Sequence, residues 1–176
     1  MIAQILDRQL MAFRIGDPAG RFPIYDGTGA GLYPGRWNTA RSPLIYASAN
    51  YATALLEKLV HGGGILPDNQ HFIQITIPPQ VSYERYDTKA HPGWDSSDER
   101  QCKTYGDAWY AERRSVILLV KSAVTKIDDN ILINPTHPEF GRLTASLHEP
   151  VYWDERLFPS ITALPVRPRR ARRDKD

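Results

Sequence analysis

The 176-residue sequence has little that would place it in an oxidising compartment or in a membrane, because it holds one cysteine and no long uncharged apolar run. A single cysteine, Cys102, excludes an internal disulfide framework and is typical of a reducing compartment. No run approaches the roughly 20 apolar residues of a membrane helix. Residues 1–8 lack the apolar core of a signal peptide. These absences predict a cytoplasmic protein that does not associate with membranes.

Metal and hydrolase signatures are also missing. The five histidines show no close metal-ligand spacing, and no cysteine pair accompanies them, which argues against a zinc site. No Gly-x-Ser-x-Gly motif supports an α/β-hydrolase triad. The glycine-rich stretch 27–31 follows no apolar strand and precedes Pro34 rather than a helix, so it is not a dinucleotide fingerprint. The sequence therefore predicts chemistry that needs no bound metal.

The composition fits one compact domain, since 41% of the residues are hydrophobic. We place that domain at residues 1–160. Residues 167–176 contain six basic and two acidic side chains, a charge of +4, whereas the rest of the chain carries −2. We expect 161–176 to form a disordered basic tail. An alternative function follows from this tail: a nucleic-acid-binding regulator that uses its arginines.

Short apolar segments separated by turn residues predict an α+β fold on a strongly bent, mainly antiparallel sheet. Two helices are expected, at 51–61 and 104–113, and the segments 16–35 and 80–103 are expected to be loops. Strands are expected at 12–15, 43–48, 73–77, 115–120, 130–134 and 150–153.

The helix at 51–61 carries the clearest local signals. Asn50 is a good N-cap, and the glycines at 62–64 end the helix. Ala54, Glu57 and His61 lie opposite the apolar positions, so periodicity alone favours a solvated Glu57 that pairs with His61. The apolar arc consists of Tyr51, Ala52, Leu55, Leu56 and Leu59.

Four short motifs follow one another along the chain. They are Gly-Arg-Trp-Asn at 35–38, Leu-Ile-Tyr-Ala-Ser at 44–48, Ala-Leu-Leu-Glu at 54–57 and Asn-Pro-Thr-His-Pro-Glu-Phe at 134–140. In this order they resemble the RES-domain family, the toxin halves of bacterial RES–Xre toxin–antitoxin pairs. The resemblance extends from about Phe13 to Phe140 and implies an ADP-ribosyltransferase-like fold.

The resemblance also implies a set of site residues. The family's Arg, Tyr and Glu fall on Arg36, Tyr46 and Glu57 of this sequence. Its Ser falls on Ser122, although Lys121 stands where the family usually has Pro, and Ser115 remains an alternative.

The implied substrate is NAD, whose nicotinamide leaves as a neutral molecule, so one carboxylate can replace the acid–base pair of ordinary glycosidases. Glu57 would stabilise an oxocarbenium-like ribose electrostatically. Arg36 would hold the pyrophosphate with its planar fork. Tyr46 would stack on the nicotinamide or its ribose, Asn38 would join them in binding the nucleotide, and Ser122 would orient Glu57.

The resemblance thus implies an enzyme, a toxin that cleaves NAD at the nicotinamide–ribose bond. The acceptor stays open: water, phosphate or a protein side chain. An Xre-like antitoxin that covers the active site is the implied partner. DNA would then be contacted only through that antitoxin.

Overall fold

The computed structural model describes residues 3–63 and 68–158. Within them lie three α-helices, α1 (Thr28–Leu32), α2 (Tyr51–His61) and α3 (Arg100–Glu112), and two 3₁₀ turns, η1 (Phe140–Arg142) and η2 (Glu155–Leu157). The strands are β1 (Gln4–Ile5), β2 (Leu10–Gly16), β3 (Ile45–Ser48), β4 (His71–Ile77), β5 (Ser82–Arg85), β6 (Ile117–Lys121), β7 (Asp129–Ile133), β8 (Thr144–Ala145) and β9 (Glu149–Pro150). No described helix is long and apolar enough to cross a membrane.

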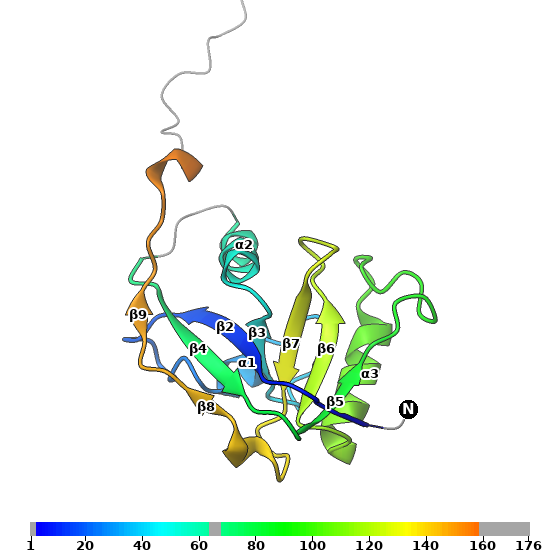
Figure 1. Ribbon diagram of the computed structural model, residues 1–176. Helices are drawn as coiled ribbons and strands as arrows, with labels where there is room; N and C mark the ends of the chain where they lie inside the picture. Colours follow the sequence, from blue (N-terminus) through cyan, green and yellow to red (C-terminus); the bar gives the residue numbers. More distant parts are fainter. Residues whose placement is uncertain (1–2, 64–67, 159–176) are drawn as a thin grey trace, which may run out of the picture.

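The strands form one sheet in the order β1-β5-β6-β7-β3-β2-β4-β8, with β9 also paired to β4. Every pair is antiparallel except β5 and β6, which are parallel and joined through α3. Figure 1 shows α3 beside β5 and β6, and α2 near the end of β3 and the start of β7. The predicted α+β fold with a mainly antiparallel sheet is confirmed.

One buried cluster extends across both halves of the sheet. Ile75 of β4 and Ile117 of β6 both belong to it, although three strands lie between β4 and β6 in the order of the sheet. A second cluster packs α3 against the other face, with Trp109 and Cys102 on Leu118 and Leu132. Strand alternation explains the division, since neighbouring residues of β6 and β7 point to opposite faces.

Helix α2 has the predicted bounds and the predicted cap, as the Asn50 side chain accepts a hydrogen bond from the Thr53 amide. The predicted apolar arc is only partly buried. Thr53 and Ala54 are the buried residues of the helix, whereas Ala52 and Leu56 are exposed. Tyr51, Leu55 and Leu59 are half-buried, and the Tyr51 ring packs on Phe13 and Phe72. The small Ala54 allows close approach, and the Thr53 hydroxyl donates to the half-buried Asp128 carboxylate, so these two residues are the most deeply buried of the helix.

Several other predictions need correction. The segment 80–103 contains β5, and α3 begins at Arg100, four residues earlier than expected. The segment 16–35 contains the short helix α1. The edge strands β1 and β8 were not predicted, and the expected strand at 150–153 is represented only by β9. Residues 159–176 lie outside the described residues, so the domain boundary at 160 and the basic tail stay predictions.

Arg14 joins β2 to the segments that surround it. Its Nε donates to the carbonyl of Ile24 at 2.6 Å, and its two Nη atoms donate to the carbonyls of Tyr46 and Asp26 at 2.8 and 3.1 Å. Burial lowers the pKa of Arg14 to about 10, which still leaves the guanidinium charged at neutral pH. Arg14 therefore fixes the start of the 24–46 segment on the sheet.

Gly106 allows α3 to pack directly against the Gly-Arg-Trp-Asn loop. A Cβ at this position would lie 1.8 Å from the carbonyl oxygen of Trp37, which is backbone and cannot rotate away. We therefore expect Gly106→Ala to lower the free energy of unfolding by at least about 2 kcal/mol, the scale of overpacking. Denaturant unfolding measures this.

Gly29→Ala is the matched control, because a Cβ at Gly29 in α1 would meet nothing within 4 Å. Its stability should be unchanged or up to about 1 kcal/mol higher, since alanine favours helix. Equal stability of the two variants would contradict the proposed packing of α3.

Candidate active site

The Glu57 carboxylate is the point on which the polar groups of this region converge. Ser122 Oγ donates to Glu57 Oε1 at 2.8 Å, and Asn130 Nδ2 donates to the same oxygen at 2.7 Å. The Glu57 side chain is only 19% exposed, and His61 Nε2 lies 3.9 Å from Oε2. The solvated position that periodicity favours for Glu57 is therefore wrong, while its pairing with His61 is present.

Ser122 is held rigidly where β6 ends. Its side chain is fully buried, and its oxygen accepts hydrogen bonds from the amides of Val124 and Thr125. With both amides directed at the oxygen, its own proton is left for Glu57. Ser115 is equally buried, but its hydroxyl donates to the Ile117 carbonyl and accepts from the Trp109 indole. Of the two serines left open by the sequence, Ser122 is the one in contact with Glu57.

Sequence reasoning missed Asn130 and Ser48 as members of this site. They face each other across β3 and β7, and Ser48 Oγ donates to Asn130 Oδ1 at 2.7 Å. Asn130 is 73 positions from Glu57, and nothing local distinguishes it from any polar residue at the start of a strand. Only the register of β7 against β3 brings the two residues together.

The Gly-Arg-Trp-Asn loop is assembled around the Tyr46 hydroxyl. Tyr46 donates to Asn38 Oδ1 at 2.7 Å and accepts from the Trp37 amide at 3.1 Å. Asn38 is fully buried and also accepts from the Gly35 amide. A Cβ at Gly35 would lie 2.9 Å from the Tyr46 hydroxyl oxygen, so the loop needs glycine there. Burial raises the pKa of Tyr46, which keeps its phenol protonated.

Arg36 lies at the edge of this loop and contacts a different segment. Its Nη1 donates to the carbonyls of Trp94 and Ser96 at 3.1 and 2.7 Å, and its Nη2 lies 3.6 Å from the Glu99 carboxylate. Lys126, on the turn after Ser122, contacts the same segment through Asp95 at 2.8 Å. Segment 94–99 is thus contacted by Arg36 from the Gly-Arg-Trp-Asn loop and by Lys126 from the turn after β6.

The predicted residues form two neighbouring groups on one face of the sheet. Tyr46 and Ser48 are two residues apart on β3 and point to the same face, and their partners Leu132 and Asn130 do likewise on β7. Glu57 joins this row through Asn130. Arg36 contacts neither Glu57 nor Tyr46 directly among the hydrogen bonds and ion pairs of residues 3–63 and 68–158.

The turn that follows Ser122 is fastened to α2 by a second polar contact. Thr53 Oγ1 donates to Asp128 Oδ2 at 2.7 Å, and this hydrogen bond lowers the pKa of Asp128. The carboxylate therefore stays ionised at neutral pH.

In the described part of the chain no three His, Cys, Asp or Glu side chains are grouped so as to hold a metal ion.

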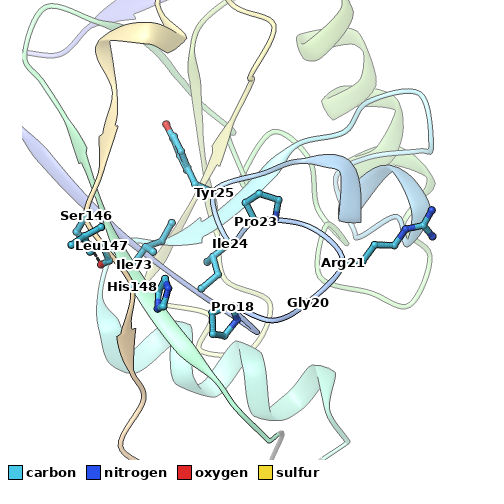
Figure 2. A pocket seen from close by; sticks show the side chains of 10 residues that line it. All are labelled: Pro18, Gly20, Arg21, Pro23, Ile24, Tyr25, Ile73, Ser146, Leu147 and His148. Carbon is cyan, nitrogen blue, oxygen red and sulfur yellow. Dashed lines mark hydrogen bonds between the residues drawn. The ribbon is translucent and has the colours of Figure 1, made fainter.

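A hollow of about 380 Å³ lies elsewhere, beside β4 and the 18–25 loop (Figure 2). Ile24 and Ile73, which line it, belong to the core on the other face of the sheet from Tyr46. Figure 2 shows the Tyr25 hydroxyl directed away from His148 and Pro18. This hollow has no carboxylate in its lining and contains none of the predicted site residues, so it is separate from the Glu57 site.

The order of the four motifs agrees with comparison to known proteins. The RES domain matches residues 11–154. The chain belongs to the RES domain family. A relative from Sphingobium sp. (strain YBL2), named Prs ADP-ribosylating toxin, is 34% identical over 153 residues, which cover 83% of this chain and 95% of the relative. The family resemblance read from the sequence is thereby confirmed.

A second named toxin and one solved structure are also similar to this chain. Toxin Res of Photorhabdus laumondii subsp. laumondii is 32% identical over 121 residues, covering 67% of this chain and 77% of that toxin. The crystal structure of the M. tuberculosis MbcT–MbcA toxin–antitoxin complex contains a chain with a TM-score of 0.66 and 16% identity, with 85% of this RES chain and 87% of that chain covered. At this identity the structural likeness establishes the fold.

The Gly-Arg-Trp-Asn loop at 35–38 should depend on the Tyr46 hydroxyl for its stability. Tyr46→Phe leaves the Trp37 amide without its acceptor and removes one donor from the buried Asn38. We expect the free energy of unfolding to fall by roughly 1 to 3 kcal/mol, the scale of an unsatisfied buried group. Tyr33→Phe, at a side chain that is 83% exposed, should change it by less than about 0.5 kcal/mol. Equal unfolding midpoints for both variants would contradict the assigned role of Tyr46.

Proposed function

We propose that this RES protein is a toxin that cleaves NAD at the nicotinamide–ribose bond, with Glu57 as the catalytic carboxylate. The observation that carries the proposal is the Glu57 carboxylate itself, partly buried and held by two hydrogen-bond donors on one oxygen. The match to the RES domain and the relative named as an ADP-ribosylating toxin support the same chemistry.

Glu57 would act by electrostatics rather than by proton transfer to the leaving group. Nicotinamide leaves NAD as a neutral molecule, so positive charge develops on the ribose in the transition state. A fixed carboxylate beside the ribose lowers the energy of that charge, and it does so most effectively where water is largely excluded. Ser122 and Asn130 hold the carboxylate in place, which avoids reorganisation when the charge appears.

Arg36 would bind the nucleotide directly, and Tyr46 and Asn38 would contribute to binding by supporting its loop. The Arg36 fork now contacts two carbonyls and one carboxylate of segment 94–99. A pyrophosphate would offer stronger, charge-assisted acceptors for the same N–H groups. Binding of NAD would therefore exchange those protein acceptors for phosphate oxygens. Tyr46 and Asn38 would hold the loop so that Arg36 keeps its position.

The protein would act in the cytoplasm, where an Xre-like antitoxin would cover the active site. The MbcT neighbour, solved with the antitoxin MbcA, supports a partner of this kind. Transfer of ADP-ribose to a protein is supported by the name of the Sphingobium relative, and water or phosphate are the other acceptors that the chemistry allows. DNA contact would come only through the antitoxin.

Glu57→Gln tests the proposal. The amide keeps the size of the side chain and an oxygen that can accept from Ser122 and Asn130, but it removes the negative charge. We expect NAD turnover to drop by roughly 100-fold or more. Stability should change by less than about 1 kcal/mol. The measurement is nicotinamide release at saturating NAD, together with the melting temperature.

Glu112→Gln provides the matched control, since Glu112 is a helix carboxylate that pairs with Arg114 at 3.0 Å and is 60% exposed. Its turnover should equal that of the wild type. A folded Glu57→Gln protein with near-normal turnover would remove Glu57 from the mechanism.

A further inference from the structure

We infer that Asn130 and Ser48 form a positioning chain for Glu57, and that this chain leaves Oε2 of Glu57 as the oxygen that faces the substrate. The inference rests on the proposed function, because it assigns roles within the same site. Ser48 is the last residue of the Leu-Ile-Tyr-Ala-Ser motif, whereas Asn130 lies outside all four motifs by which the sequence resembles the RES family.

The two oxygens of the Glu57 carboxylate have different surroundings. Oε1 accepts from Ser122 at 2.8 Å and from Asn130 at 2.7 Å. Among the hydrogen bonds and ion pairs of residues 3–63 and 68–158, Oε2 has one contact, with the His61 ring at 3.9 Å, and the His61 side chain is 77% exposed. Because both strong donors act on Oε1, the carboxylate is anchored by that oxygen and Oε2 is left to interact with the ribose.

The Glu57 carboxylate and the Ser48 hydroxyl together fix which end of the Asn130 amide meets Glu57. An asparagine amide can present either its NH₂ group or its carbonyl oxygen to a neighbour. The Ser48 hydroxyl donates to Asn130 Oδ1 at 2.7 Å, and this contact directs Nδ2 toward the carboxylate. The reversed amide would place Oδ1 against a carboxylate oxygen, which is repulsive. Ser48 therefore acts on Glu57 through Asn130 without touching it.

The β3–β7 ladder makes this chain rigid. Ser48 and Asn130 are direct cross-strand partners, and Ser48 is buried. The terminal torsion of a glutamate is otherwise broad, so a carboxylate without this anchor would sample several orientations. A displacement of about 1 Å at a catalytic group can cost roughly 100-fold in rate. Loss of the chain should consequently lower kcat much more than it changes KM.

The experiment compares the kinetics of Asn130→Ala, Ser48→Ala, Ser48→Thr and the double variant with those of the wild type. We expect Asn130→Ala to lower kcat roughly 10- to 100-fold with little change in KM. Ser48→Ala should lower kcat as well, and Ser48→Thr should retain it because the hydroxyl remains. The double variant that combines Asn130→Ala with Ser48→Ala should be no slower than Asn130→Ala alone, since Ser48 acts only through Asn130.

Asn134→Ala is the matched control, from the residue that follows β7. Asn134 is fully buried and donates to the Tyr110 carbonyl, so its loss should lower stability but leave kcat of the folded enzyme unchanged. A purely structural role for Asn130 would instead give kcat values that match this control. Additive losses of kcat in the double variant would also overturn the inference.

A second readout does not depend on turnover. The side-chain NH₂ signals of Asn130 in NMR should be protected from exchange in the wild type and in Ser48→Thr, and should lose protection in Ser48→Ala. If wild-type protein left NAD intact while these signals behaved as expected, the proposed function would fail and the positioning chain would stand. If the wild type cleaved NAD and the Asn130 and Ser48 variants kept their kcat, the positioning chain alone would fail.

Discussion

The hydrogen bonds that end on Glu57 are the interaction on which the site depends, because they tie three distant segments into one unit. Glu57 comes from α2, Ser122 from the turn after β6, and Asn130 from β7. The same helix is fastened to the same turn by Thr53 and Asp128. A carboxylate that is largely buried needs such partners, since unpaired burial would be costly. The donors that stabilise the fold here are the groups that would hold Glu57 ready for catalysis.

The Gly-Arg-Trp-Asn loop follows a second constraint, the close approach of backbone to neighbouring groups. Gly106 admits the Trp37 carbonyl against α3, and Gly35 admits the Tyr46 hydroxyl against the loop. Tyr46 then bonds both Trp37 and Asn38. The loop that carries Arg36 is thus fixed by its neighbours, while the guanidinium itself makes its contacts with segment 94–99. A rigid loop with an exchangeable side chain would suit the role proposed for Arg36, which is to take up phosphate when the nucleotide binds.

The sequence predicted those features that depend on neighbouring residues, such as helix bounds and caps. The bounds and cap of α2 follow from Asn50 and Gly62, and the family motifs led to a sheet and fold that the structure confirms. The burial of Thr53 did not follow, because the leucines outweigh it in any periodicity and its hydrogen-bond partner, Asp128, is 75 positions away. Asn130 was missed for the same reason, since strand register rather than sequence brings it to Glu57. The catalytic and nucleotide-binding roles of Glu57, Arg36, Tyr46, Asn38 and Ser122 stay proposals.

The most direct test of the central claim is a stoichiometric assay of the purified protein with NAD in the presence of a chelator. The account predicts that nicotinamide appears as NAD disappears, one for one, and that EDTA does not slow the reaction, because the proposed chemistry relies on a fixed carboxylate and not on a metal ion. Folded protein that leaves NAD intact, or activity that is lost with EDTA and restored by zinc or magnesium, would contradict it.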